Sequence, residues 1–249
     1  MKTALCTFPN IDNIDLAVQY MLAWIDEAAS LDCDLAVFPE ASLGGLELGY
    51  DWESDANRSL ELSSITIDEL KDKALVKRIG IGFGFLERDA GMIYDSYVLL
   101  NPQGGIEARY RRISPGWLPS GVDRTAYGCG SEIGFVNTVW GGIGILLCSD
   151  LFDNEIVYKI AARKPDLCLH PLARAVTYNP DIQSNWDEQE LPFYLEQYAK
   201  LPAPVLAVNC LDAAILDRSV YCGGAWHISE GRLLKAKPLL ESGMLIVDH

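Results

Sequence analysis

The spacing of apolar residues predicts alternating strands and helices at the start of the chain. Residues 3–8 form a short apolar run that is typical of a buried strand. Apolar positions then recur at helical spacing over residues 14–28, with Asp12 or Asn13 as the N-cap. The next apolar run, residues 34–38, predicts a second strand, so the chain opens as a strand-helix-strand unit.

A second helix and a third strand continue this order. Residues 66–69 read Thr-Ile-Asp-Glu, a capping box that predicts a helix beginning there and running to about Arg78. Residues 79–86 are apolar and interleaved with glycine, as in a buried strand. The pattern therefore predicts a sheet whose first strands are joined through helices.

The middle of the chain contains two predicted hairpins. Strand-like runs at residues 94–100 and 106–111 are separated only by the turn sequence Asn-Pro-Gln-Gly-Gly. The runs at residues 135–140 and 143–148 flank a Gly-Gly pair. Within each pair we expect antiparallel neighbours, because so short a connection leaves no room for a crossover.

The last hundred residues return to mixed strands and helices. We expect a helix capped by Asp153, a strand at 167–170, a helix at 187–200 capped by Asp187 and Glu190, and strands at 205–209, 220–228 and 245–247. The segment 172–186 is long for a connection, which favours a role facing the substrate.

Hairpins combined with strand-helix units predict a layered α/β sandwich. A closed (β/α)₈ barrel fits less well, since it needs a helix between consecutive strands. No repeat, low-complexity tract or linker interrupts the sequence, so we expect one domain over residues 1–249.

Composition narrows the classes of partner. The chain is 49% hydrophobic and 22% charged, as in a globular protein, and its formal net charge is -15. Such a charge repels a phosphate backbone, so we expect no nucleic-acid partner. Residues 1–9 hold one Lys and too short an apolar stretch for a secretory signal, and no run reaches membrane-spanning length. We therefore expect a cytoplasmic protein without a membrane partner.

Cysteine and histidine usage argues against a metal centre. Seven cysteines occur singly within apolar runs, without a C-x-x-C pair, and reduced thiols are expected. The three histidines do not pair with one another or with a cysteine at metal-ligand spacing. We predict neither a metal nor another cofactor.

Two residues at predicted strand ends could carry chemistry. Cys148 ends a strand that runs into a turn before a helix, where backbone N–H groups favour a thiolate or an oxyanion. Glu40 follows Phe38-Pro39, and apolar neighbours would raise the pKa of its carboxyl group into the range of an acid/base catalyst. Taken one at a time, a core cysteine and a surface glutamate are the commoner interpretations.

Three motifs in order make the chain resemble the nitrilase superfamily of carbon-nitrogen hydrolases. Residues 36–40 (AVFPE) resemble its glutamate motif, residues 109–113 (RYRRI) its lysine motif, and residues 144–150 (GILLCSD) its cysteine motif. Further matches in the same order occur at residues 101–104, 208–209 and 223–224. The resemblance implies a four-layer αββα sandwich, a homodimer or higher homo-oligomer, and attack of Cys148 on a carbon-nitrogen bond to give a thioester that water cleaves.

The resemblance also assigns expected roles around the cysteine. It places Arg112 where the family has its catalytic lysine, and a guanidinium differs from an ammonium in shape and does not deprotonate. Arg111 should face the other way, because side chains alternate along a strand. We expect Ser149, Asp150 and Asp123 at the substrate pocket, with Asp150 as an orienting group. Asp123 or Glu132 could stand in for the family's second glutamate.

The main hypothesis is a hydrolase of a small amide, in which Glu40 moves the proton while Arg112 and the Ser149 N–H hold the oxyanion. Arg112 and backbone N–H groups should then depress the pKa of Cys148, making it the first of the seven cysteines to be alkylated. A nitrile is less favoured, because Ser149 occupies the position of the Trp that usually follows the cysteine in nitrilases of the narrow sense.

Two alternatives remain. The first is a catalytically impaired relative that binds a metabolite or a partner through the same pocket, for which Arg112 is the main evidence. The second is a (β/α)₈ glycosidase using strand-end carboxylates such as Glu40, Glu87 and Asp150, which the two hairpins disfavour.

Overall fold

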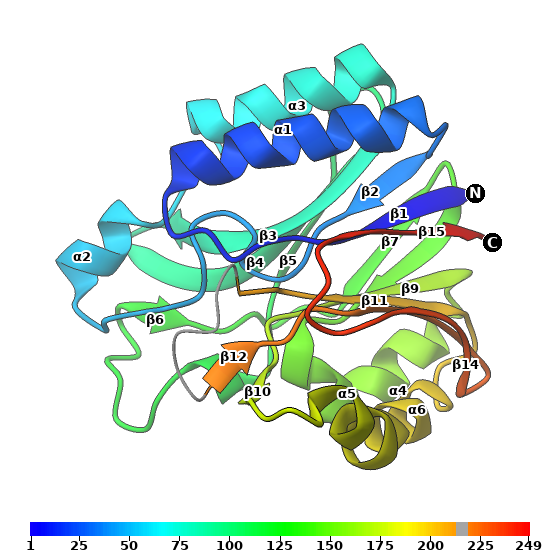
Figure 1. The fold of residues 1–249 in the computed structure, drawn as a ribbon. Helices are drawn as coiled ribbons and strands as arrows, with labels where there is room; N and C mark the ends of the chain where they lie inside the picture. Colours follow the sequence, from blue (N-terminus) through cyan, green and yellow to red (C-terminus); the bar gives the residue numbers. More distant parts are fainter. Residues whose placement is uncertain (213–218) are drawn as a thin grey trace.

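Two β-sheets face each other at the centre of the molecule, as the computed structural model shows for residues 1–212 and 219–249 (Figure 1). The first sheet has seven strands, of which β6 (Tyr127–Gly128) pairs with β4 off the main path. The main order is β15 (Gly243–Asp248), β1 (Lys2–Thr7), β2 (Leu35–Val37), β3 (Gly80–Asp89), β4 (Met92–Leu100) and β5 (Ile106–Arg111).

The second sheet has six strands and is also mixed. Its order is β14 (Arg232–Lys237), β13 (Ala225–Ser229), β11 (Val205–Asn209), β9 (Leu167–Leu172), β8 (Gly141–Ile145) and β7 (Gly134–Thr138). A separate short pair joins β10 (Ala175–Thr177) to β12 (Ser219–Tyr221). Both predicted hairpins are confirmed, since β4 pairs antiparallel with β5 and β7 with β8.

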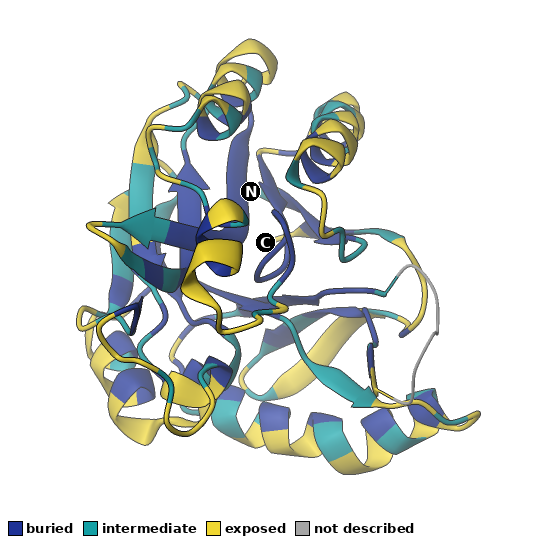
Figure 2. Cartoon of the chain, turned by 90° about the vertical axis from the view of Figure 1, so that its left-hand side faces the viewer, coloured by how far each residue is buried: buried dark blue, intermediate teal, exposed yellow. Residues whose placement is uncertain are grey.

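Helices cover the outer face of each sheet. Over the first sheet lie α1 (Ile14–Ser30) and α3 (Ile65–Lys77), and over the second lie α4 (Asn154–Ala162), α5 (Ile182–Asn185) and α6 (Leu191–Tyr198) (Figure 1). The helices are buried on their inner sides and exposed on their outer sides (Figure 2). The inner faces of the sheets share a core that includes Leu5, Tyr97, Ile145 and Leu169. This order of layers confirms the predicted αββα sandwich.

The first helix illustrates how the sequence specifies these layers. Its buried residues, from Ala17 to Ala28, recur at helical spacing and face the sheet. Asn13 caps the helix, because its side chain accepts a hydrogen bond from the Leu16 N–H at 2.9 Å. The short helix α2 (Trp52–Asn57) lies away from these layers, at one end of the molecule.

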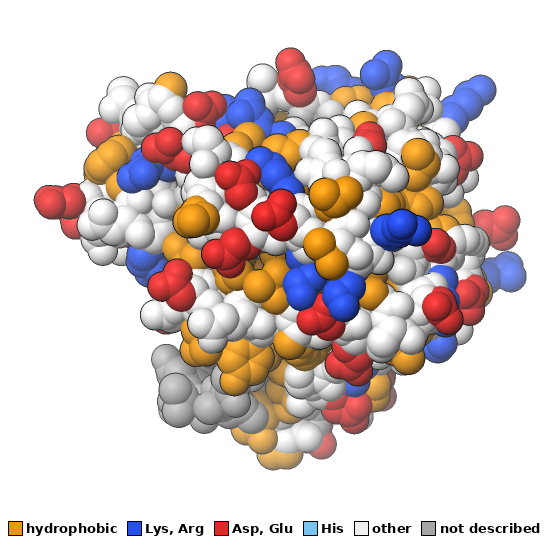
Figure 3. Space-filling view, turned by 90° about the horizontal axis from the view of Figure 1, so that it is seen from above, with side chains coloured by type: hydrophobic (Ala, Val, Ile, Leu, Met, Phe, Trp, Pro, Cys, Tyr) orange, Lys and Arg blue, Asp and Glu red, His pale blue; other side chains and the backbone are white. Residues whose placement is uncertain are grey.

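The outer surface over α1 and α3 mixes charged and apolar side chains (Figure 3). Asp26 on α1 forms ion pairs with Lys73 at 2.9 Å and with Lys77 at 3.0 Å, both on α3. These part-exposed pairs add little stability, so burial of the inner faces dominates the packing of the two helices. Among the described residues, no helix combines the length and the apolar composition needed to cross a membrane.

Several predicted boundaries were wrong. Helix α3 begins at Ile65 and not at a Thr66 capping box, since Ser64 is its N-cap and makes no side-chain cap bond. The helix expected at 187–200 begins at Ile182, and its turn at Trp186–Glu190 is a π-helix. Asp187 and Glu190 therefore lie inside the helical segment, and Glu190, although it stands at the N-cap position of α6, makes no side-chain cap hydrogen bond.

The predicted C-terminal strands also needed correction. The strand expected at 220–228 is two strands, because the chain bends at Gly223 and Gly224, whose φ angles of 69° and 95° no strand accommodates. Strand β14 was not predicted. Its exposed, Lys- and Arg-containing sequence lies at an edge of the second sheet, where an apolar pattern is not required.

Gly84 allows β3 to approach the segment that carries Glu40. A Cβ atom at this position would lie 2.5 Å from the Ala41 nitrogen and 2.8 Å from the Glu40 Cα, closer than side-chain and backbone atoms can approach. The contact also includes a backbone hydrogen bond of 3.2 Å from the Gly84 N–H to the Pro39 carbonyl. A side chain at 84 would therefore separate β3 from this segment.

We predict that Gly84→Ala lowers the free energy of unfolding by about 1–3 kcal/mol, because the added methyl group has no space. Gly49→Ala is the matched control, since the nearest atom to its Cβ outside the adjoining residues would be Asp55 Oδ1 at an ordinary 3.8 Å. Urea denaturation of both variants measures the difference. Equal effects from the two substitutions would contradict the close approach at Gly84.

Candidate active site

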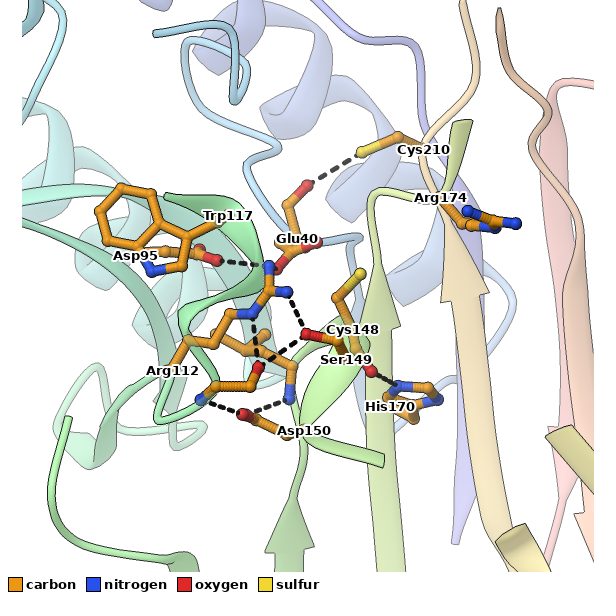
Figure 4. Close-up of polar contacts among 12 residues, drawn as sticks. Glu40, Asp95, Arg112, Trp117, Cys148, Ser149, Asp150, His170, Arg174 and Cys210 are labelled. Carbon is orange, nitrogen blue, oxygen red and sulfur yellow. Dashed lines mark hydrogen bonds and ion pairs between the residues drawn. The ribbon is translucent and has the colours of Figure 1, made fainter. Parts of the chain in front are cut away.

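Glu40 lies just beyond the C-terminal end of β2 and is fully buried. Its Oε1 accepts a hydrogen bond of 2.9 Å from Arg112 Nη1, while its Oε2 has no partner. Its carbonyl oxygen accepts a hydrogen bond of 2.9 Å from the Cys210 thiol, and the next residue, Ala41, has a left-handed φ of 53°. This turn directs the Glu40 carboxylate between the two sheets, towards Arg112 and Cys148 (Figure 4).

Cys148 begins a 3-10 turn, Cys148–Phe152, that follows β8. Its backbone is left-handed, with φ 42°, which is strained for a residue with a Cβ. His170 on β9 supports the turn, because its Nε2 lies 2.9 Å from the Cys148 carbonyl while its Nδ1 lies 2.6 Å from the Tyr198 hydroxyl. Burial lowers the pKa of His170 to about 4, so the ring is neutral and donates to Cys148.

Asp150 supports the same turn from the other side. Its Oδ2 accepts hydrogen bonds from the Tyr110 hydroxyl at 2.6 Å and from the Leu147 N–H at 3.0 Å. Its Oδ1 accepts from the Ser114 N–H at 2.8 Å. The carboxylate is completely buried and both oxygens are occupied. Asp150 therefore orients the cysteine turn through these bonds, while the expectation that it also binds substrate stays a prediction.

Arg112 follows β5, and its guanidinium connects Glu40 to the turn that carries Cys148 (Figure 4). Besides Glu40, its Nη1 contacts Asp95 Oδ2 at 3.3 Å. Its Nε donates to Ser114 Oγ at 3.0 Å, and its Nη2 donates to Ser149 Oγ. A guanidinium carries five N–H groups, so four are engaged and one on Nη2 remains. The Ser149 hydroxyl is part of this hydrogen-bonded group, and its expected contact with a substrate stays a prediction.

Arg111 faces the opposite side of β5, which confirms the predicted alternation. Its guanidinium pairs with Glu87 at 2.9 Å and with Asp89, and it lies 3.7 Å from the centre of the Tyr94 ring. Glu87 is committed to this arrangement and to a hydrogen bond from Ser96. It is therefore absent from the group around Cys148, contrary to the glycosidase alternative.

The electrostatics of Cys148 correct one expectation. Burial raises the pKa of its thiol to about 12, the charge of Glu40 adds to the increase, and Arg112 opposes it. A hydrogen bond from the backbone of Ala173 also lowers the pKa, but by less than burial raises it. The predicted depressed pKa was wrong, because the carboxylate and the low-dielectric surroundings outweigh the guanidinium. The resting sulfur is a thiol.

Arg112 remains a cation in these surroundings. Burial alone would lower the pKa of the guanidinium, but neighbouring acidic groups, of which Glu40 has the largest effect, raise it above its ordinary value. It can therefore donate hydrogen bonds but cannot act as an acid, which separates its chemistry from that of a lysine.

The two candidates for a second acidic residue do not join the group. Asp123 is exposed, and its Oδ1 accepts from the Thr125 N–H at 2.9 Å and from the Thr125 hydroxyl at 2.7 Å. These local bonds lower the pKa of Asp123 and form a turn. Glu132 is exposed and lines the same surface hollow as Arg111. Because Arg111 points to the opposite face of β5 from Arg112, this hollow lies away from the group around Cys148. Neither position supports the expected role.

The acidic residue that does lie at the site is Asp95, on β4. It is buried beside Glu40 and Arg112, and sequence reasoning did not identify it. Its one sequence signal is an Asp within an otherwise apolar strand, where an unpaired carboxylate would be costly. This signal predicts that Asp95 has a partner but does not identify it. Arg112 is distant in sequence and meets Asp95 only because β4 pairs with β5 in the folded sheet.

Residues 173 and 174 run beside the cysteine, at the start of the segment expected to face the substrate. The Asn209 side chain holds this backbone by accepting from the Arg174 N–H at 2.7 Å and donating to the Arg174 carbonyl at 3.0 Å. The Arg174 side chain pairs with Glu190 at 3.0 Å and lines a surface hollow with Trp186. The segment is not an irregular loop throughout, since it contains β10 and α5.

Curated relatives with similar sequences match only part of this chain. An aliphatic nitrilase of Sinorhizobium fredii (strain HH103) is 24% identical over 157 residues, or 56% of this chain and 49% of its own length. A cyanide hydratase of Botryotinia fuckeliana is 28% identical over 154 residues, covering 56% of this chain and 40% of its own. The chain thus spans half or less of the length of these relatives.

Solved structures match over the whole fold. An amidase from Nesterenkonia sp. AN1 has a TM-score of 0.79 at 17% identity, covering 100% of this chain and 92% of its own. A carbon-nitrogen hydrolase from Helicobacter pylori G27 has a TM-score of 0.75 at 16% identity, covering 99% of this chain and 87% of its own. A mutant of the Nesterenkonia amidase carries acrylamide added at its active-site cysteine.

The match to a family model is complete along the chain. The model for carbon-nitrogen hydrolases covers residues 2–249, which include Glu40, Arg112 and Cys148. Together with the αββα fold, this match establishes that the chain belongs to the carbon-nitrogen hydrolase family.

Proposed function

We propose that the protein hydrolyses a small amide through a thioester on Cys148, with Glu40 as the acid/base and Arg112 as the oxyanion-stabilising cation. The observation that carries this proposal is the buried contact of 2.9 Å between Arg112 Nη1 and Glu40 Oε1, next to the strained turn that presents Cys148. Buried charges at a turn of this kind are typical of a catalytic site and have little structural value of their own.

The raised pKa of Cys148 defines the role of Glu40. Because the resting sulfur is protonated, attack on the amide carbon requires a base, and Glu40 is the carboxylate whose charge acts most strongly on this thiol. The S–H proton passes to Glu40 as the C–S bond forms. Glu40 then returns this proton to the nitrogen as the C–N bond breaks and ammonia or an amine leaves.

Water completes the cycle. Glu40, which has lost its proton to the leaving nitrogen, takes a proton from a water molecule. The oxygen of this water attacks the thioester carbon at the same time. The C–S bond then breaks, the sulfur regains the proton from Glu40, and a carboxylic acid is released. Each carbon-nitrogen bond hydrolysed consumes one water, and no redox or metal partner takes part in any step.

The tetrahedral intermediate carries its negative charge on the former carbonyl oxygen. We assign this charge to the remaining N–H on Arg112 Nη2 and to the Ser149 backbone N–H at the start of the turn. The hydroxyls of Ser114 and Ser149 prevent the guanidinium from rotating, since each accepts one of its hydrogen bonds. Arg112 therefore offers a donor in fixed position before the substrate arrives.

An amide suits this site better than a nitrile, although the sequence relatives include proteins named as an aliphatic nitrilase and a cyanide hydratase. Attack on a nitrile leaves negative charge on nitrogen, which must be protonated at once. Arg112 cannot supply that proton, because its pKa is raised, so it would have to come from Glu40. Attack on an amide leaves an oxyanion, which needs only donated hydrogen bonds.

We predict that Arg112→Ala lowers kcat for amide hydrolysis by about 10²-fold or more, a typical loss for one oxyanion donor. Arg112→Lys should also be poor, because one ammonium nitrogen cannot reach Glu40, Asp95 and both serines together. Ammonia release across a panel of amides measures both variants, with Arg111→Lys on the opposite strand face as the control.

Two outcomes of that experiment oppose the proposal. Turnover that is indifferent to both substitutions would remove Arg112 from the mechanism. An inactive natural protein that gains turnover with Arg112→Lys would identify a catalytically impaired relative.

The role of Glu40 predicts the direction of a change in alkylation rate. Glu40→Gln removes a charge that raises the pKa of Cys148, so a site that relies on electrostatics alone would react faster. If Glu40 accepts the thiol proton, the same substitution should slow reaction of Cys148 with acrylamide at pH 7.5 by about tenfold or more. Peptide mapping measures the rate, with the partly exposed Cys129 as the internal control. Faster labelling of Cys148 would exclude Glu40 as its base.

A further inference from the structure

Asp95 is a buried charged residue at the site for which the proposed steps give no role. Its side chain is 1% exposed and points from β4 to the Glu40 and Arg112 pair (Figure 4). Its Oδ2 lies 3.3 Å from Arg112 Nη1, the same nitrogen that contacts Glu40 at 2.9 Å. Two carboxyl groups therefore share the single charge of one guanidinium, and each accepts a hydrogen bond from the same nitrogen.

Charge balance shows that one proton is needed in this group. The titratable and charged side chains acting on Asp95 are Glu40 and Arg112, and Asp95 in turn acts on the thiols of Cys148 and Cys210, which are neutral because burial raises both pKa values. The Asp150 carboxyl group also acts on Arg112, but its two oxygens are already occupied by hydrogen bonds from Tyr110, Leu147 and Ser114, so it lies outside this group. With both carboxyl groups ionised, the group would hold an uncompensated negative charge away from water. A buried, unpaired charge of this kind is strongly unfavourable and is normally removed by protonation.

The unpartnered atoms indicate where that proton lies. Asp95 Oδ1 and Glu40 Oε2 are both buried and without a hydrogen-bond donor. The two carboxyl groups are close enough to form a hydrogen bond with each other, so a proton on Asp95 supplies a donor for Glu40. The Trp117 indole N–H is also buried without a partner, but donation from it to Asp95 would leave Glu40 Oε2 unsatisfied and the extra charge in place.

We propose that Asp95 is a positioning residue that holds a proton at neutral pH and donates it in a hydrogen bond to Glu40, which keeps Glu40 ionised and aligned on Arg112. Asp95 rather than Glu40 holds the proton because Glu40 has the shorter contact with the guanidinium, 2.9 Å against 3.3 Å. Burial, the Glu40 charge and the hydrogen bond to Glu40 raise the pKa of Asp95 well above its ordinary value.

The inference rests on the proposed function, because it explains how Glu40 remains a base. A permanently charged arginine can neutralise only one carboxylate. If Asp95 were ionised, it would share the guanidinium charge with Glu40 and place a second negative charge beside Cys148. The proton on Asp95 removes that charge and leaves the guanidinium to Glu40 and to the oxyanion.

The protonation of Asp95 can be tested without turnover. At pH 8 the natural protein should show the infrared C=O band of a protonated carboxyl group, and Asp95→Asn should lack it. Melting temperature gives a second readout. A carboxyl group whose folded pKa exceeds its unfolded value loses its stabilising contribution as pH rises from about 4 through the folded pKa. The melting temperature of Asp95→Asn relative to the natural protein should therefore increase between pH 5 and pH 8.

Two results would overturn this assignment. A protonated carboxyl band that persists in Asp95→Asn would place the proton elsewhere. A melting temperature that Asp95→Asn lowers equally at every pH would mean that an ionised Asp95 pairs with Arg112. Neither readout depends on amide hydrolysis, so these results stand even if the proposed function fails.

Turnover then tests the positioning role. Asp95→Asn retains a donor for Glu40 and an acceptor for Arg112, so kcat should fall by less than about tenfold, while Asp95→Leu should lose about 10²-fold or more because it supplies neither. KM should change little in both, since Asp95 does not contact the substrate. Equal loss in the two variants would show that the carboxylate charge, and not the donated hydrogen bond, is required.

Discussion

The buried guanidinium of Arg112 is the interaction on which the site depends. It joins the end of β2 through Glu40, strand β4 through Asp95 and the cysteine turn through Ser149. Removing a cation from water costs several kcal/mol, and only well-placed partners offset such a cost. Arginine suits this position because its planar, five-donor head engages several acceptors at once, which a lysine ammonium cannot reproduce.

The fold places these partners by simple geometric means. Parallel pairing of β1, β2 and β3 fixes the position of Glu40 at the end of β2. Gly84 allows the backbone turn at Glu40 and Ala41 to lie directly against β3. Strand β8 delivers Cys148 from the opposite sheet to the same interior space. Neutral His170 and the occupied carboxylate of Asp150 then hold the strained turn. The layers therefore determine the site as much as the reactive residues do.

Local patterns predicted much of this arrangement from the sequence. Turn chemistry identified both hairpins, and side-chain alternation separated Arg111 from Arg112. The first N-cap was narrowed to Asp12 or Asn13, of which the structure shows Asn13, and Asp153 was identified as the N-cap of α4. The motifs around Glu40, Arg112 and Cys148 predicted residues that the fold does bring together.

What the sequence missed depends on contacts between distant segments. Asp95 meets its partners only through strand pairing, and Asp123 lies near the expected position in sequence but binds Thr125 in an exposed turn. The sign of the Cys148 pKa shift was predicted wrongly because burial depth and the position of Glu40 are properties of the folded chain. Helix boundaries failed where packing, and not a capping motif, sets the first residue.

Covalent acylation of Cys148 is the central claim and can be measured directly. The protein should be mixed with a series of small primary amides, quenched in acid within one turnover, digested and analysed by mass spectrometry. We predict that the peptide containing Cys148 gains the mass of the acyl group, that Cys148→Ala shows no such gain, and that the other cysteine peptides remain unmodified. Amide hydrolysis that proceeds without an adduct on Cys148, or that persists in Cys148→Ala, would contradict the mechanism.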